Sequence, residues 1–150
     1  MSISNVFKLV NILLVEDDSV DAEAVERSLR SHDIDSPITV ARDGAEALDH
    51  LRGTNGKAPI PKPHLVLLDL NMPGMNGLEF LRELRQDDNL RATLTFVLTT
   101  SNDPRDREAT YDQNVAGYIV KSHTGEDFEE LMRLIERAWK LGDLTDDEGA

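Results

Sequence analysis

The sequence predicts an α/β domain in which a parallel sheet carries helices on both faces. Short apolar runs alternate with longer amphipathic stretches, and five of each follow one another along the chain. Right-handed crossovers place the helices on both faces and bring the carboxyl ends of all strands to one edge of the sheet. The 150 residues are enough for one domain. We expect it to span residues 11–141, between an N-terminal extension at 1–10 and an acidic C-terminal tail at 142–150.

The first half of the chain holds two predicted strand–helix units. Asn11–Val15 is apolar and too short for a helix, so we predict a buried strand. Ser19 and Asp18 are both suitable N-cap residues for the helix that follows. Ile38–Ala41 is the second predicted strand, and Asp43 precedes the second predicted helix. The inner faces of these two helices carry Ala22, Val25, Leu29, Ala47, Leu48 and Leu51.

The second half holds three further units. Leu65–Leu68, Phe96–Thr100 and Gly117–Val120 are the predicted strands, and helices are expected after Asn76 and Asp103. The last helix carries an apolar stripe at i, i+3, i+4, i+7 and i+11, which is typical of a helix packed on a core. This stripe consists of Phe128, Leu131, Met132, Ile135 and Trp139.

The composition argues against several classes of function. The chain has 29 acidic and 16 basic residues, a net charge of −13, whereas binding to bare DNA or RNA needs clustered Lys and Arg. It has no cysteine, which excludes disulfides, thiolate metal sites and cysteine nucleophiles. No apolar run approaches the ~18 residues of a membrane span, and the first residues do not resemble a signal peptide. We therefore expect a cytoplasmic protein that binds neither nucleic acid nor membrane.

Polar side chains follow four of the five predicted strands. The first strand ends at Glu16 and Asp17, the third at Asp69, the fourth at Thr100 and the fifth at Lys121. Crowded carboxylates repel one another, so a hard divalent cation such as Mg²⁺ is their natural partner. The set predicts a site that holds a phosphoryl group, with Asp69 as the nucleophile of an acyl phosphate. Mg²⁺, Lys121 and Thr100 would stabilise the charge on the transferring oxygens.

Alternative roles for these residues are less well supported. Singly, each could be a helix cap, a solvated lysine or a sheet-edge threonine. A haloacid-dehalogenase-type phosphatase needs a second aspartate two residues after its nucleophile, where this chain has Asn71. A Toprim-type nucleic-acid enzyme needs an Asp-x-Asp pair that is missing here. A nucleotide-binding domain would have a glycine-rich first turn in place of Glu16, Asp17 and Asp18.

Over roughly residues 11–140 the chain resembles the receiver domain of bacterial two-component response regulators. The matching segments are Ile12–Asp18, Leu67–Gly74, Leu98–Ser101 and Gly117–Lys121. The resemblance implies a flavodoxin-like, doubly wound (βα)5 sandwich with a five-stranded parallel sheet in the order 2-1-3-4-5. It also implies a single-domain response regulator that takes a phosphoryl group from a partner histidine kinase. Such a protein is a phosphoacceptor that signals through protein contacts, and catalyses only its own phosphorylation and dephosphorylation.

The resemblance also implies which residues form the metal site. Asp69 would be the phosphoacceptor and a ligand of Mg²⁺. Asp17 would bind the ion directly, and Glu16 through water. Asn71 would contribute its backbone carbonyl.

Further roles follow from the same resemblance. Thr100 matches the switch hydroxyl that turns towards the phosphoryl group, and Tyr118 matches the aromatic residue that moves with it. Lys121 matches the ion-pairing lysine and is expected to pair with Asp69 in the resting state. The side chains of Asn71 and Asn102 lie where the family tunes dephosphorylation.

The sequence suggests candidate partners and differs from the family pattern at one position. The Pro-rich loop at 53–63 and the segment Leu98–Asp103 resemble small regulators paired with phytochrome-type histidine kinases. A homodimer and a downstream phosphotransfer protein are further candidate partners. Ser122 follows Lys121 where the family usually has a cis proline, so the sequence leaves this peptide open as cis or trans. The alternative function is a receiver-like interaction module that no longer depends on phosphorylation, which the presence of Asp69, Thr100 and Lys121 disfavours.

Overall fold

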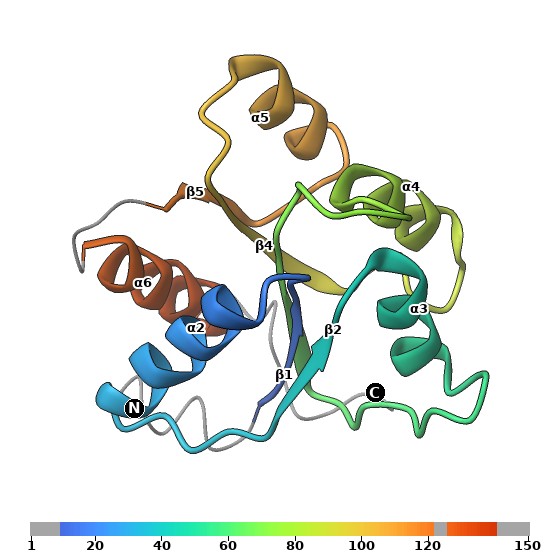
Figure 1. The fold of residues 1–150 in the computed structure, drawn as a ribbon, viewed down its shortest axis with the longest axis horizontal. Coiled ribbons are helices and arrows are strands. Elements are labelled where there is room, and N and C mark those ends of the chain that lie inside the picture. Colours follow the sequence, from blue (N-terminus) through green and yellow to red (C-terminus); the bar gives the residue numbers. More distant parts are fainter. Residues whose placement is uncertain (1–9, 122–125, 141–150) are drawn as a thin grey trace.

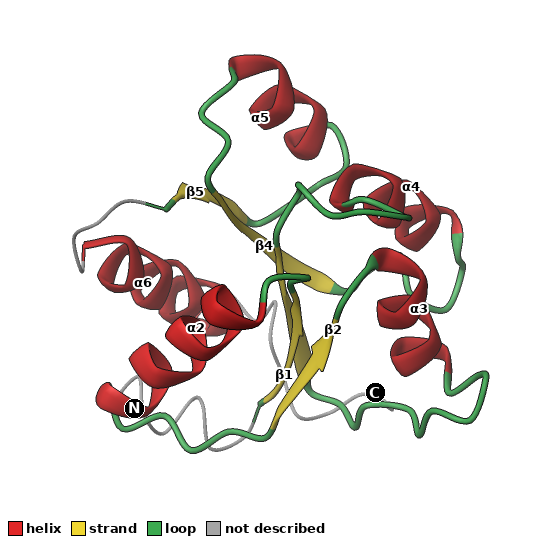
Figure 2. Ribbon diagram, in the orientation of Figure 1, coloured by secondary structure: helices red, strands yellow, loops and turns green. Residues whose placement is uncertain are grey.

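The computed structural model describes residues 10–121 and 126–140. Ser122, the tail at 142–150 and nearly all of the extension at 1–10 lie outside these residues, as does the side chain of Trp139. Strands and helices alternate along the described chain (Figure 2). They are β1 (Asn11–Val15), α2 (Ser19–Ser31), β2 (Ile38–Ala41), α3 (Gly44–Arg52), β3 (His64–Leu68), α4 (Gly77–Gln86), β4 (Leu94–Thr99), α5 (Pro104–Tyr111), β5 (Gly117–Val120) and α6 (Glu126–Lys140).

The five strands form one parallel sheet in the order β2-β1-β3-β4-β5, which confirms the predicted fold class and strand order. Helices α2 and α6 cover one face of the sheet, and α3 and α4 cover the other (Figure 1). Helix α5 follows β4 and lies beside α4 (Figure 1). In the described part of the chain, no helix is long and apolar enough to span a membrane.

The core consists of two apolar layers, one on each side of the sheet. Successive strand residues point to opposite faces, so Ile12 and Leu14 pack towards α2 and α6 while Leu13 and Val15 pack towards α3 and α4. A parallel sheet buried on both faces requires such uninterrupted apolar strands. The inner-face residues expected of α2 and α3 are all buried, namely Ala22, Val25, Leu29, Ala47, Leu48 and Leu51.

Side-chain caps begin four of the helices. Asp18, rather than Ser19, is the N-cap of α2, because its carboxylate accepts hydrogen bonds from the backbone N–H groups of Val20 and Asp21. Asp43, Asn76 and Asp103 cap α3, α4 and α5. Each capping residue lies in the loop that leaves the carboxyl end of a strand. The four helices therefore start at the carboxyl edge of the sheet.

Arg85 on α4 joins two loops, one before β4 and one between α5 and β5. Its guanidinium donates hydrogen bonds to the carbonyl oxygens of Arg91 and Thr93, both at 2.9 Å. It also donates to those of Gln113 at 2.7 Å and Asn114 at 3.3 Å. Burial lowers the pKa of Arg85. One side chain therefore holds the loop before β4 and the loop between α5 and β5 in place.

Candidate functional site

Three carboxylates meet at the carboxyl edge of the sheet. Glu16 and Asp17 follow β1 and Asp69 follows β3, and one oxygen of each lies within 4.8 Å of the others. Glu16 and Asp69 are buried, with 3% and 7% of their surface exposed, and Asp17 is half-buried. Buried carboxylates at this spacing repel one another unless a proton or a cation compensates. The set fits a hard divalent cation with oxygen ligands.

Backbone hydrogen bonds hold two of these carboxylates in place. The N–H of Glu16 donates to the carbonyl of Ala41 at 2.9 Å, and the N–H of Asp69 donates to that of Val15 at 3.0 Å. Both bonds continue the sheet past the ends of β1 and β3. Gly77 packs against the loop after Asp69, where an added Cβ would lie 2.6 Å from the Asp69 carbonyl oxygen. The position of Asp69 therefore depends on the sheet and on a close approach that only glycine allows.

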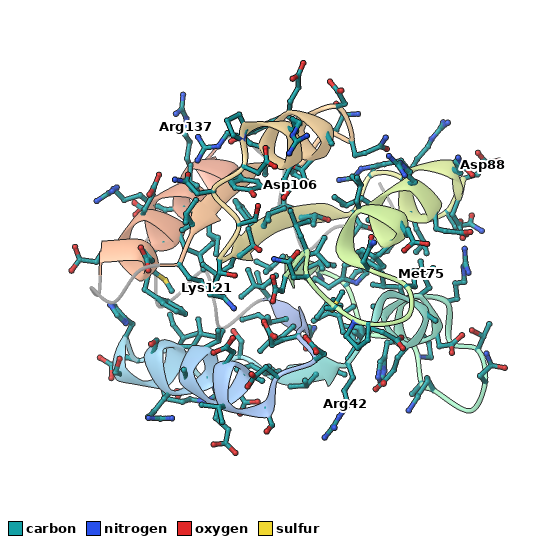
Figure 3. The ribbon with its side chains drawn as sticks, turned by 45° about the horizontal axis from the view of Figure 1, so that its top comes forward. Arg42, Met75, Asp88, Asp106, Lys121 and Arg137 are labelled. Atoms are coloured by element: carbon teal, nitrogen blue, oxygen red, sulfur yellow. The ribbon has the colours of Figure 1, made fainter. Side chains whose placement is uncertain are left out.

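Lys121 lies among three carboxylates. Its Nζ is 3.0 Å from Glu16 Oε2, 3.6 Å from Asp21 Oδ2 and 4.0 Å from Asp69 Oδ2. The expected pairing with Asp69 is thus the longest of the three, and Glu16 is the nearest partner. Burial opposes the charge on this lysine, but the hydrogen bond to Glu16 and the charges of Glu16, Asp69 and Asp21 outweigh it and raise the pKa of Lys121. In Figure 3 the lysine lies between α6 and α2, which carries Asp21.

Burial, and then a hydrogen bond with the Asp69 carboxyl group, raise the pKa of Glu16 to about 7. The backbone N–H of Asp18 and the ammonium of Lys121 act in the opposite direction but do not cancel the shift. Glu16 can therefore hold a proton between itself and Asp69 when no cation is bound. Below about pH 7 a cation at this site competes with that proton.

The metal-free protein is expected to lose stability as the pH rises from about 4.5 to about 7. Folded Glu16 keeps its proton in this range, whereas the unfolded chain releases it near pH 4.5, so folding binds a proton and a higher pH opposes folding. Thermal unfolding in a chelator across this range measures the slope. Glu16→Gln cannot ionise and should lack this component of the slope, so an equal slope in the variant would contradict the assignment.

A divalent cation should raise the melting temperature more above pH 7 than below it. Binding needs the ionised carboxylates and stabilises the folded state by mass action. Asp17→Asn should remove most of the cation-dependent shift because it deletes a charged ligand. An undiminished shift in this variant would mean that the cation binds elsewhere.

The hydroxyl that contacts Asp69 in the structure belongs to Thr99, one residue before the predicted Thr100. Thr99 is fully buried at the end of β4, and its Oγ1 donates a 2.8 Å hydrogen bond to Asp69 Oδ1. Thr100 comes after the strand and is exposed. Successive residues of a strand point to opposite sides, so only one of two adjacent threonines can face the neighbouring strand end. The predicted strand ended at Thr100, whereas β4 ends at Thr99. A strand predicted one residue shorter would have indicated Thr99.

Tyr118 and the two asparagines lie around this centre. The Tyr118 ring is buried, its hydroxyl donates a 2.9 Å hydrogen bond to the carbonyl oxygen of Ser101, and the Arg107 guanidinium lies 5.0 Å from the ring centroid. Asn71 is exposed, and its backbone N–H donates to Asp69 Oδ1 at 3.3 Å. Asn102 is exposed beyond β4. Ser101, two residues after Thr99, was not among the predicted site residues.

Comparison with protein families adds to this geometry. The family model described as "response regulator receiver domain" matches residues 12–135. Response regulator Rcp1 of Synechocystis sp. is 37% identical over 128 residues, which cover 85% of this chain and 87% of that protein.

Solved structures show the same likeness. The Mn²⁺-bound form of response regulator Rcp1 is 36% identical, covers 87% of this chain and 93% of its own, and superposes with a TM-score of 0.72. The phosphorylated cyanobacterial phytochrome response regulator RcpA is 33% identical, covers 90% of this chain and 96% of its own, and has a TM-score of 0.71.

Proposed function

Because the chain belongs to the response regulator receiver domain family and is a two-component response regulator, we propose that it takes a phosphoryl group onto Asp69 from a partner histidine kinase. The observation that carries this proposal is the convergence of three side chains on Asp69. Glu16, Lys121 and Thr99 come from the ends of β1, β5 and β4, and all three lie around its carboxylate. Helix caps and solvated surface charges do not require such convergence.

Asp69 supplies the attacking oxygen in the proposed transfer. The bond between the phosphorus and the kinase histidine nitrogen breaks as a bond forms to an Asp69 carboxylate oxygen. Lys121 places a positive charge beside the transferring oxygens, and the Thr99 hydroxyl can donate to one of them. As a compact point charge, the Lys121 ammonium can leave Glu16 and follow the phosphoryl group without a fixed bidentate geometry.

We propose Mg²⁺ as the cation, held by Glu16, Asp17, Asp69 and the backbone carbonyl of Asn71. The acidic donor set fits it, since Mg²⁺ is bound in proteins by one or two carboxylates with waters and phosphate oxygens. When bound, it would neutralise negative charge on the phosphoryl oxygens. The Mn²⁺-bound form of Rcp1 supports a divalent cation in a relative.

Intact-mass measurement tests the proposal directly. Incubation with acetyl phosphate and Mg²⁺ should add the mass of one phosphoryl group, because the receiver itself supplies the groups that promote transfer. The same incubation with a chelator should add none. A mass gain that is indifferent to the chelator would argue against a metal-assisted site at Asp69, and the absence of any gain from both this donor and the kinase would favour the phosphorylation-independent interaction module.

Thr99→Val should slow phosphoryl uptake by about tenfold or more, whereas Thr100→Val should leave it nearly unchanged. The first variant keeps the buried shape but removes the hydroxyl that contacts Asp69. The second changes an exposed side chain. The initial rate of labelling by acetyl phosphate distinguishes them, and the reverse ranking would restore Thr100 as the switch residue.

The proposed partner is a sensor histidine kinase of the phytochrome type. This rests on the likeness to RcpA, which is a phytochrome response regulator.

We propose that phosphorylation draws the Thr99 hydroxyl towards the phosphoryl group, that Tyr118 follows, and that α5, β5 and α6 present the altered surface. A homodimer and a downstream phosphotransfer protein are candidate readers of that surface. Co-purification with the kinase, with and without acetyl phosphate, would identify which contact depends on phosphorylation.

A further inference from the structure

Helix α5 is attached to the domain differently from its neighbours. Helices α2, α3 and α4 each bury three or four residues, whereas Thr110 is the buried residue among the eight of α5. Apolar burial is the usual source of helix stability in a protein, so α5 depends to an unusual degree on polar contacts at its two ends.

The carboxyl end of α5 is held by Arg85. This side chain donates to the carbonyl oxygens of Gln113 and Asn114, directly after the helix, and to two carbonyls before β4. These bonds are independent of the Asp69 site. The carboxyl end is therefore a fixed point.

The amino end of α5 is held through Ser101. The Ser101 hydroxyl donates a short hydrogen bond to Asp106 Oδ2 in the first turn of the helix, and Asp106 lies on the side of α5 that faces the sheet (Figure 3). The Ser101 backbone also contacts two residues near Asp69. Its N–H donates to Thr99 Oγ1 at 3.3 Å, and its carbonyl oxygen accepts a hydrogen bond from the Tyr118 hydroxyl. Thr99 in turn donates to Asp69. A continuous hydrogen-bonded chain thus runs from Asp69 through Thr99 and Ser101 to Asp106.

We propose that Ser101 and Asp106 are positioning residues that latch the amino end of α5 to the Asp69 site. Movement of the Thr99 hydroxyl would displace Ser101 and release Asp106, while Arg85 keeps the other end of α5 in place. The direction of this signal rests on the proposed function, because it assumes that Thr99 follows a phosphoryl group on Asp69. The latch itself exists in the unphosphorylated protein and is tested there.

Amide hydrogen exchange of residues 104–111 in the unphosphorylated full chain tests the latch. Ser101→Ala and Asp106→Ala should each speed exchange about tenfold, since each removes the same hydrogen bond to a charged group. The Ser101 hydroxyl also accepts from the backbone N–H of Asp103 at 3.4 Å. The double variant should therefore be about as fast as Ser101→Ala alone, because Asp106→Ala then removes nothing further. Asp106→Asn keeps an oxygen acceptor and should restore most of the protection. Glu108→Ala, which removes an exposed charge from the same helix, should leave exchange unchanged.

The link to the site is tested by Thr99→Val, which removes the hydroxyl that accepts from Ser101. It should speed exchange in α5 and leave α3 unchanged. Additive effects of the two single variants, an equal effect of Glu108→Ala, or an unchanged α5 in Thr99→Val would each overturn the proposal. None of these outcomes depends on phosphorylation, so they are distinct from a failure of Asp69 to accept a phosphoryl group.

Discussion

Asp69→Asn is expected to abolish the Mg²⁺-dependent gain of one phosphoryl group. An amide oxygen is a poor nucleophile and cannot form the acyl phosphate, although the side chain keeps its shape and can still accept the Thr99 hydrogen bond. Intact-mass measurement after incubation with acetyl phosphate gives the result, and hydrogen exchange or thermal unfolding shows that the variant is folded. Removing one carboxylate from a crowded cluster should not lower the melting temperature of the metal-free protein.

Asp35→Asn is the matched control for this experiment. Asp35 is an exposed aspartate before β2, at the opposite edge of the sheet from the site. It should be labelled as fast as the unchanged protein. Labelling of Asp69→Asn at that rate would place the phosphoryl group on another residue.

Arg85→Ala is expected to lower the free energy of unfolding by about 2–4 kcal/mol. The change removes four hydrogen bonds to backbone carbonyls, and leaves the carbonyl of buried Thr93 with the hydrogen bond from the Thr95 hydroxyl. Urea denaturation measures the loss. Arg82→Ala removes an exposed arginine from the same helix and should change stability by less than about 0.5 kcal/mol.

Arg85→Lys separates the charge from the geometry. A lysine keeps the positive charge but cannot present the planar fork that reaches both loops at once. We expect it to recover only a minor part of the lost stability. Equal stability of Arg85→Lys and the unchanged protein would show that charge, rather than the four bonds, is what matters at this position.

The order of residues along the chain was sufficient to predict the architecture and the edge where the site lies. Apolar runs such as Asn11–Val15 and Leu65–Leu68 are too short for helices, and the crossovers between parallel strands send all their carboxyl ends in one direction. Residues that directly follow strands therefore had to meet, which is why Glu16, Asp17 and Asp69 could be placed together without coordinates. This inference depends on backbone topology alone.

Side-chain direction and exact strand ends, in contrast, were set by tertiary packing. The pleat of β4 turns Thr99 towards Asp69 and leaves Thr100 exposed, a difference of one residue that no apolar pattern records. Lys121 lies 3.0 Å from Glu16 and 4.0 Å from Asp69, an order of partners that the position of Lys121 after a strand does not specify.

The contacts that hold α5 were likewise invisible in the sequence. Arg85 and Ser101 are polar residues that belong to no apolar pattern. Their hydrogen-bond partners, such as Gln113 for Arg85 and Asp106 for Ser101, are set by the folded structure. A sequence pattern reports which residues face a core, whereas a hydrogen bond between distant segments depends on distances of a few tenths of an ångström. Those distances are set by the packing of the whole domain.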